Sequence, residues 1–255
     1  MNSRRELGIL FGACLTTLIG CSGGLSPADT VLRSTELEVT GRQSQDIAIE
    51  APADSHVLVT IRSPGVDVRA SLLGASGDAL GPPVNAPNKR MGIETLLLDP
   101  PHEPRFAIRI EGLDHGGARG LVTVDAVALP VSSAADRRRL EAARLESNAG
   151  RQFSDLAQGE ATASSYAAAA DLHVKNRDHR LAGIALLHVS GARYARLADW
   201  RGAADLAAQA ERLLDQVDAP GLAAFSMRLE GAALAQLADA ADSTPASRRQ
   251  ALERA

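Results

Sequence analysis

The sequence predicts an α+β protein in separate domains: a small antiparallel β-sandwich followed by an array of α-helical hairpins. Two patterns lead to this prediction. Apolar and other residues alternate with period two from about 35 to 131, which is typical of half-buried strands. From Ser132 onward the apolar spacing becomes helical, and the strand pattern does not return. A basic start followed by an apolar stretch also predicts an export signal.

The composition limits the function classes. The chain has 255 residues, of which 45% are apolar, so it is long enough for one or two domains. Its formal charge is −4, from 27 basic and 31 acidic side chains, and only 3% of its residues are aromatic. A nucleic-acid-binding surface needs basic residues and stacking aromatics. We therefore expect no nucleic-acid partner.

The first twenty residues have the organisation of a signal peptide. Arg4 and Arg5 precede the apolar or small stretch 7–20. At about 1.5 Å per residue, this stretch would span about 21 Å as a helix, which is less than a hydrocarbon core of about 30 Å. Residues 1–20 are therefore predicted to be a signal peptide rather than a membrane span. The segment Ser3–Leu7 also permits a loose twin-arginine signal, and this alternative stays open.

The end of this segment, Leu18-Ile19-Gly20-Cys21, resembles the lipobox of bacterial lipoproteins. The resemblance implies that Cys21 receives a diacylglycerol and that cleavage occurs just before it. It also implies a lipid anchor in the bacterial cell envelope. The residue after the cysteine is Ser22 rather than an aspartate. In Gram-negative bacteria, this resemblance implies that the lipoprotein is sorted to the outer membrane, facing the periplasm. An ordinary secretory signal with an unrelated cysteine is the alternative.

The lipoprotein prediction also determines the fate of the two cysteines and the start of the mature chain. The two cysteines are Cys14, which would leave with the signal, and Cys21, which would be acylated. The mature chain would then hold no disulfide and no cysteine nucleophile. Residues 21–34 are rich in glycine, serine and small polar residues, and we expect them to be a flexible tether.

Residues 35–131 contain about seven short strands separated by turn signals. The apolar positions that define them are Leu37/Val39, Ile47/Ile49, Val57/Val59/Ile61, Val66/Val68/Ala70/Leu72, Leu96/Leu98, Phe106/Ile108/Ile110 and Val122/Val124. Short strands at this spacing favour an antiparallel β-sandwich. The alternation places Phe106 inside, so the region lacks an exposed aromatic on which a glycan could stack.

This region resembles the pre-peptidase C-terminal-like family of exported bacterial β-sandwiches. The matching residues are Gly65-Val66-Asp67-Val68, Gly77-Asp78, the loop Asn85–Arg90, Gly92, Glu94 and the strand Phe106–Glu111. Lys89 replaces a common glycine, and Phe106 stands where tyrosine is usual. The resemblance implies an accessory or binding module rather than a catalyst.

Residues 132–255 are predicted to be helical. Ser132-Ser133 can cap the first helix, with Asp136 in its first turn. The expected helices cover 134–157, 160–175, 179–197, 200–215, 219–239 and 244–255. The last would begin with a serine-threonine cap followed by Pro245.

An internal repeat occurs within this helical region. The stretch 191–199 aligns with 231–239, and six of nine positions are identical. Gly191, Tyr194, Ala203 and Ala210 have a spacing that resembles the tetratricopeptide repeat. The resemblance implies a groove for a protein or peptide ligand, lined by the candidate partner-binding residues His188, Arg196, Phe225, Arg228 and Gln236. Two arginines and an imidazole would suit a carboxylate-bearing peptide. A generic alanine-rich bundle with merely exposed side chains is the alternative.

The sequence contains none of the common catalytic motifs that we considered, such as G-x-S-x-G, H-E-x-x-H or C-x-x-C. His173 and His179 are interpreted as solvated imidazoles at a helix junction rather than a zinc pair. The segment Asp114–Gly117 is interpreted as a hairpin turn, and Asp136–Arg139 as a solvated helix face, with lipid-phosphate contact as the alternative. We therefore expect no enzyme activity, no cofactor and no metal.

These observations predict a membrane-anchored scaffold that binds other proteins and performs no catalysis of its own. The alternative is the accessory N-terminal region of a longer caspase-like (CHAT) peptidase, because the order signal, sandwich and repeats resembles such proteins. Their His/Cys pair follows the repeats, and the mature chain has no unlipidated cysteine, so that catalysis would lie beyond Ala255.

Overall fold

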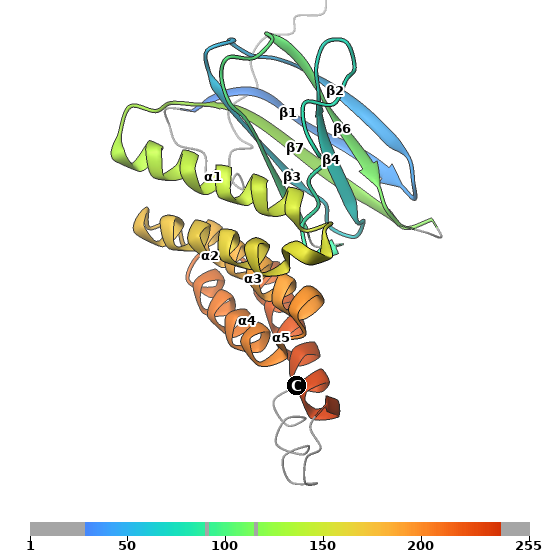
Figure 1. Cartoon of the computed structure of the whole chain (residues 1–255), viewed down its shortest axis with the longest axis vertical. Helices are drawn as coiled ribbons and strands as arrows, with labels where there is room; N and C mark the ends of the chain where they lie inside the picture. The colour runs from blue at the N-terminus through green and yellow to red at the C-terminus, as the bar shows by residue number, and fades with distance from the viewer. Residues whose placement is uncertain (1–28, 90–91, 115–116, 241–255) are drawn as a thin grey trace, which may run out of the picture.

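The computed structural model describes residues 29–89, 92–114 and 117–240. In these ranges seven strands precede five α-helices, which confirms the predicted α+β order (Figure 1). The signal peptide, Cys21 and the expected helix 244–255 lie outside the described residues. No helix of the described ranges is long and apolar enough to cross a membrane.

The strands form two antiparallel sheets. Their bounds are β1 (Thr30–Thr40), β2 (Ser44–Glu50), β3 (His56–Arg62), β4 (Val68–Leu73), β5 (Ile93–Leu98), β6 (Arg105–Gly112) and β7 (Arg119–Leu129). One sheet has the order β1-β7-β3-β5, and the other has the order β2-β6-β4. The alternation pattern predicted each of these strands. The first strand begins at Thr30, so the stretch 30–34 belongs to the sandwich rather than to the expected tether.

The sandwich core lies between the two sheets. Val57, Val59 and Ile61 of β3 are fully buried, as the alternation required. Ile108 and Ile110 of β6 face them from the other sheet in the same apolar cluster. Phe106 is also in this cluster and is 3% exposed, which confirms its predicted inward position.

The helices are α1 (Ala134–Gln152), α2 (Gly159–Lys175), α3 (His179–Ala192), α4 (Trp200–Asp215) and α5 (Pro220–Ala240). Ser133 caps α1 as expected: its hydroxyl accepts from the Asp136 N–H at 3.0 Å, and the Asp136 carboxylate accepts from the Ser133 N–H at 2.8 Å. The expected end of the first helix at 157 was wrong. The first helix ends at Gln152 because Asp155 caps a separate 3₁₀ turn, Leu156–Gln158.

The expected third helix, 179–197, is α-helical only as far as Ala192. Residues Arg193–Leu197 form a π-helical turn, which Ala198 terminates in the left-handed conformation at φ 50°. Asp199 then caps α4 by accepting from the Gly202 N–H at 2.9 Å. The matching repeat segment 231–239 instead continues α5 without a break. The two copies therefore share a sequence pattern but differ in backbone geometry.

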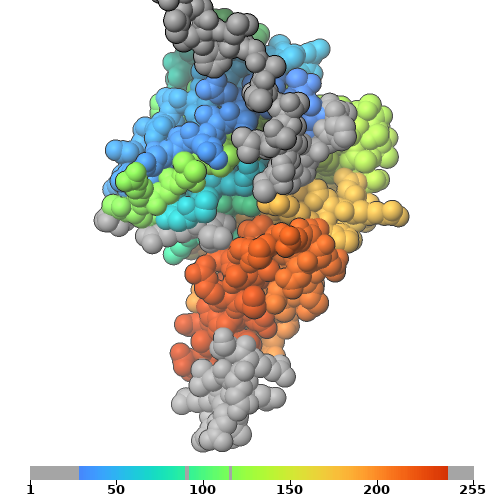
Figure 2. Space-filling view, turned by 180° about the vertical axis from the view of Figure 1, so that it is seen from behind, coloured from blue at the N-terminus to red at the C-terminus, as the bar shows by residue number. Residues whose placement is uncertain are grey.

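Each helix packs against the next one along the chain, from α1 to α5. Small residues permit close crossings: a Cβ added at Gly183 of α3 would lie 2.7 Å from Cγ of Leu214 on α4. The helices form a body that tapers away from the broader sandwich (Figures 1 and 2).

The sandwich and the helices share a direct interface. Leu140 and Ala143 of α1 form one apolar cluster with Leu97 of β5 and with Val127 and Leu129 of β7. Helix α1 thus covers the outer face of the four-stranded sheet and lies between it and α2 (Figure 1). β5 is therefore buried on both faces.

Candidate functional site

The loop between β4 and β5 joins the sandwich to the helices. Val84 exchanges two backbone hydrogen bonds with Ala70 of β4, at 2.9 and 2.8 Å, which holds the loop on the three-stranded sheet. The Asn85 N–H donates to the Gly150 carbonyl near the end of α1 at 3.2 Å. Gly150 has no room for a Cβ because the Val84 side chain occupies that space. The loop therefore packs on both the three-stranded sheet and helix α1.

The next residues of the same loop pack on α3. The Asn88 side chain lies directly against Gly191, in the space that a Cβ would need, and Pro87 Cβ would be 3.2 Å from that atom. Asn88 is 8% exposed, so its side chain is held within this contact. Gly191 is one of the residues whose spacing resembles the tetratricopeptide repeat. Its close partner in the structure is the loop of the sandwich.

A cleft opens beside this contact, with a volume of about 610 Å³. Ligand sites of proteins commonly have volumes of about 300–1,000 Å³. The sandwich and its loop contribute one part of the lining and α3 and α5 the other. The lining residues used below are Asp67, Lys89, Asp114, Tyr194, Phe225 and Arg228.

The sandwich side of the cleft is acidic. Asp67 immediately precedes β4 and Asp114 follows β6, so both lie at the same end of the three-stranded sheet. The Asp114 carboxylate accepts from the Asp67 N–H at 2.9 Å. The Asp67 carbonyl accepts from the Leu113 N–H at 2.8 Å. These bonds extend the pairing of β4 with β6 and fix both acidic residues at the rim.

The helical side of the cleft is aromatic and basic. On α5 the Arg228 guanidinium lies 5.6 Å from the centre of the Phe225 ring, within cation–π range. Tyr194 lies in the π-helical turn after α3 and packs beside a small apolar cluster between α4 and α5. On the sandwich side, Lys89 of the loop is exposed and has a positive φ of 48°. The cleft thus combines apolar rings with two cationic side chains.

The five candidate partner-binding residues do not share one surface. Phe225 and Arg228 line the cleft. Arg196 instead lies over the Phe153 ring at 4.3 Å, and Gln236 is exposed further along α5. His188 is 2% exposed, and its ring centre lies 4.8 Å from that of Tyr166 of α2, so its expected place in an open groove is wrong. The tetratricopeptide-based assignment placed it on the groove, but α2 covers that face.

Asp67, Lys89 and Asp114 were not predicted to belong to a site. They lie in turns of the sandwich, far in sequence from the helices that complete the cleft. The loop Asn85–Arg90 and Asp67 were noted only as points of family resemblance. No spacing rule connects such turns to α5, so the cleft becomes visible only in the folded chain.

A buried polar network holds the helices against the sheet. The Glu146 carboxylate of α1 lies 3.1 Å from Nε2 of His173 on α2. It also accepts from the Thr95 hydroxyl of β5 at 3.2 Å. The interpretation of His173 as a solvated imidazole was wrong, because the residue is 3% exposed. One side chain thus connects the sheet with two helices.

The ionisation of this network follows from its burial and its charges. Burial opposes the charge on Glu146, but the hydrogen bond and charge of His173 outweigh it and lower the pKa of the carboxyl. For His173, burial is likewise outweighed by Glu146, and its pKa is raised. Burial lowers the pKa of His188 to about 4, against a smaller opposing effect of Glu146. Each partner of the Glu146–His173 pair thus favours the charged form of the other, while His188 is neutral at pH 7.

The cavity next to this network is small. Its volume is about 50 Å³, and Glu146, His173 and Arg139 are among its lining residues. This is far below the size of ordinary ligand sites and suits water. The network therefore has a structural role in joining the two parts of the chain, and the cleft is the candidate site.

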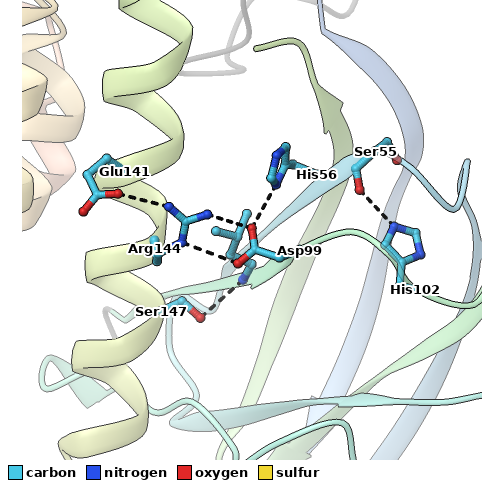
Figure 3. A network of polar contacts seen from close by, with 8 residues as sticks. Ser55, His56, Asp99, His102, Glu141, Arg144 and Ser147 are labelled. Atoms are coloured by element: carbon cyan, nitrogen blue, oxygen red, sulfur yellow. Dashed lines mark hydrogen bonds and ion pairs between the residues drawn. The ribbon is translucent and has the colours of Figure 1, made fainter.

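A second polar network ties α1 to the sandwich near the end of β5 (Figure 3). The Asp99 carboxylate accepts from Arg144 Nη2 of α1 and lies near His56 Nδ1, both at 2.9 Å. Arg144 also contacts Glu141 at 3.0 Å. The Ser147 hydroxyl accepts from the Leu97 N–H at 3.3 Å. These contacts fix α1 on the sheet edge.

The segment Asp136–Arg139 was interpreted as a solvated helix face. Arg139 does not fit this interpretation because its side chain is mostly buried. Its side chain is 14% exposed and pairs with the buried Asp29 at 2.7 Å. Arg138 donates to Asn176 at the end of α2 at 2.6 Å. These arginines hold the start of the sandwich and the end of α2 on α1.

The described residues contain no group of three or more His, Cys, Asp or Glu side chains able to hold a metal ion. No family model matches the chain, and no curated protein matches it. Among solved structures, the chain is similar to Aeromonas hydrophila PliG, a periplasmic lysozyme inhibitor of g-type lysozyme. The identity is 13%, the match covers 41% of this chain and 90% of that chain, and the TM-score is 0.30.

Proposed function

We propose that this protein is a lipid-anchored, non-catalytic scaffold of the bacterial cell envelope that binds a protein or peptide ligand in the cleft between sandwich and helices. The observation that supports it best is the cleft itself. It measures about 610 Å³ and combines Phe225 and Tyr194 with the exposed cations Lys89 and Arg228. Aromatic and arginine side chains are enriched where proteins bind one another most strongly.

The chemistry of the helical side favours a ligand with a carboxylate next to an apolar side chain. An arginine guanidinium can donate two parallel hydrogen bonds to one carboxylate. Phe225 beside it offers a flat apolar surface. In this proposal the helices form a tetratricopeptide-like array, but the ligand contacts its edge on the sandwich side rather than an open groove of the array.

The anchor is a separate part of the proposal. Cys21, with the lipobox before it, is the proposed acylation site, and acyl chains on its sulfur and amino group give stable anchoring. β1 begins at Thr30, so only residues 22–29 would separate the lipidated cysteine from the first strand. The sandwich would then lie close to the membrane surface.

The binding proposal is tested by peptide selection on the full chain. A random peptide display library is panned against the purified protein, and the dissociation constants of enriched peptides are measured by calorimetry. We expect peptides that combine an acidic and an apolar residue, with tenfold or greater loss of affinity on Phe225→Ala or Arg228→Ala.

Two matched controls come from exposed positions on the helices. Met227 is 50% exposed and does not line the cleft, and Arg201 is an exposed arginine on α4. Met227→Ala and Arg201→Ala should leave the affinity unchanged. Failure to enrich any peptide, or equal losses for cleft and control variants, would overturn the proposal.

A further inference from the structure

The start of strand β1 and the start of helix α1 lie at the same end of the sandwich. Thr30 of β1 pairs with Ala128 near the end of β7, and α1 follows β7 in the chain. The Asp29 carboxylate, whose side chain is 1% exposed, accepts from Arg139 Nη1 in the second turn of α1 at 2.7 Å. The chain therefore enters the described fold beside the first turns of α1.

The C-terminal end of α2 lies at the same place. Arg138 Nε of α1 donates to the side-chain oxygen of Asn176 at 2.6 Å, and the Asn176 amide donates to the Ala135 carbonyl at 3.1 Å. Both helix ends lie at the left of the molecule in Figure 1. They form one surface next to the point where the chain enters the sandwich.

Three cationic side chains of this surface are exposed. They are Arg137 of α1, Lys175 at the end of α2 and Arg177 in the turn that follows. Within the part of the chain that the structure describes, no acidic side chain pairs with any of them. The positive end of the helix dipole disfavours a cation near the start of a helix, so helix stability does not account for Arg137.

The surface carries an excess of positive charge, although the chain as a whole has a formal charge of −4. The neighbouring carboxylates that have partners within the fold, either an arginine or a backbone N–H, are Asp29, Asp136, Glu141 and Asp178. Asp171 is exposed one turn before Lys175 and opposes the three cations. The charge that this surface presents to solvent is therefore mainly basic.

Two exposed valines accompany the cations. Val131 directly precedes the serine pair at the start of α1 and is 39% exposed, and Val174 is adjacent to Lys175 and is 49% exposed. Protein surfaces that lie in the interfacial region of a membrane combine apolar side chains with lysine and arginine. We call this surface the basic end; it consists of Val131, Arg137, Val174, Lys175 and Arg177.

The basic end lies within reach of the proposed anchor. Cys21, the proposed acylation site, precedes Asp29 by eight residues, which span at most about 28 Å when fully extended. Because Asp29 is fixed against Arg139, the acylated residue would hold the start of α1 within that distance of the lipid. A membrane surface is therefore the partner that the position and the charge of the basic end both favour.

We infer that the basic end lies on the headgroups of an anionic membrane, with Arg137, Lys175 and Arg177 against lipid phosphates. This inference rests on the proposed lipid anchor and adds which face of the protein is turned toward the membrane. An anchor limits only the distance between protein and lipid, whereas a second contact determines orientation. One basic side chain close to an anionic surface strengthens binding about fivefold.

Fluorescence quenching on vesicles tests this orientation. Lipidated full-length protein with Val174→Cys is labelled with a fluorophore at the new thiol and is reconstituted into vesicles whose headgroups carry a quencher. Met227→Cys on α5 is the matched control, because Met227 is 50% exposed. Vesicles of phosphatidylcholine are compared with an equal mixture of phosphatidylcholine and phosphatidylglycerol. Flotation of the vesicles records anchoring separately.

On the anionic vesicles, we expect the label on α2 to be quenched about threefold more than the label on α5. The difference should disappear on phosphatidylcholine and decrease with added salt. Arg137→Gln combined with Lys175→Gln should remove most of it. Arg201→Gln combined with Arg212→Gln, at two exposed positions of α4, is the charge-matched control and should leave it unchanged.

The outcomes separate the orientation from the anchor on which it rests. Flotation with equal quenching of the two labels would overturn the lipid contact and leave the anchor intact. The same follows if the difference persists on phosphatidylcholine or survives the loss of Arg137 and Lys175, and the cations would then be open to an acidic protein instead. A protein that floats with neither kind of vesicle would remove both the anchor and the orientation.

Discussion

The side chain of Asn88 occupies the space that a Cβ of residue 191 would need, so the sandwich loop and helix α3 are in contact at a glycine. This contact determines where Lys89 lies, because Lys89 is the next residue of the loop. It therefore links the packing of the two parts of the chain to the shape of the cleft.

Gly191→Ala should displace this loop. The added methyl group would overlap Asn88 and approach Pro87, and such overpacking costs about 1–3 kcal/mol. The better helix propensity of alanine offsets up to about 1 kcal/mol of this. We expect a net loss of unfolding free energy in urea and a weaker affinity for any cleft ligand.

Gly221→Ala is the matched control for this substitution. Gly221 lies in the first turn of α5, and a Cβ there meets no atom within 4 Å. It should leave stability unchanged or raise it slightly, without affecting binding. Equal effects of the two substitutions would show that Asn88 adapts freely and that the contact does not position the loop.

The Glu146–His173 pair should contribute stability only in a limited pH window. The pKa of His173 is raised, so its contribution is present below about 6.5, the usual value of histidine, and is lost as pH rises through the folded value. The pKa of Glu146 is lowered from 4.5, so its contribution is lost as pH falls through the folded value. A double-mutant cycle with Glu146→Gln and His173→Gln should give about 1–3 kcal/mol near pH 5.5.

The exposed Arg144–Asp99 pair serves as the comparison. The two side chains are 38% and 46% exposed, and such pairs contribute about 0–1 kcal/mol. Its cycle should give a smaller coupling that decreases with added salt. A coupling for Glu146 and His173 that is equally small, or independent of pH, would contradict the buried ion pair.

His188 should make the fold sensitive to mild acid. Its pKa is about 4 in the folded protein and about 6.5 in the unfolded chain, so the unfolded chain binds a proton first as pH falls. The unfolding free energy should therefore decrease by about 3 kcal/mol from above pH 6.5 to pH 4 through this residue. His188→Phe, which cannot titrate, should remove that part of the pH dependence in urea titrations. An unchanged pH profile would contradict a neutral buried His188.

Glu94 should have the opposite pH dependence. Burial raises the pKa of Glu94, which is 0% exposed, so the unfolded chain releases its proton first as pH rises above about 4.5. Glu94→Gln should match the wild type in melting temperature at pH 4 and exceed it at pH 7.5. Glu36→Gln, at an exposed position of β1, should shift neither temperature. A lower melting temperature for Glu94→Gln at pH 7.5 would show that the carboxylate is stabilising.

Local patterns were sufficient to predict most of the secondary structure. Inward residues such as Val57, Val59 and Ile61 alternate in sequence because one face of β3 lies in the sandwich core. Ser133 and Asp136 marked the start of α1 because a capping box is a local interaction. Such features depend on residues that are close in the chain, and sequence spacing reveals them.

Contacts between distant segments could not be predicted in this way. The covering of β5 by α1 left only an indirect signal, the consecutive apolar residues Leu96-Leu97-Leu98, which indicate burial on both faces. Phe225 and Arg228 were proposed as binding residues through family resemblance, whereas Asp67 and Asp114 were missed. Their proximity to α5 results from the docking of the whole sandwich on the helices.

The central claim is that a protein ligand binds the cleft, and photocrosslinking in living cells tests it most directly. Phe225, which lines the cleft, and Met227, which is exposed outside it, are each replaced with photoreactive benzoylphenylalanine in the full-length protein. Irradiation should give a discrete adduct of higher mass from position 225 that is weak at position 227 and disappears with Arg228→Glu. No adduct from position 225, or the same adduct from both positions, would contradict the account.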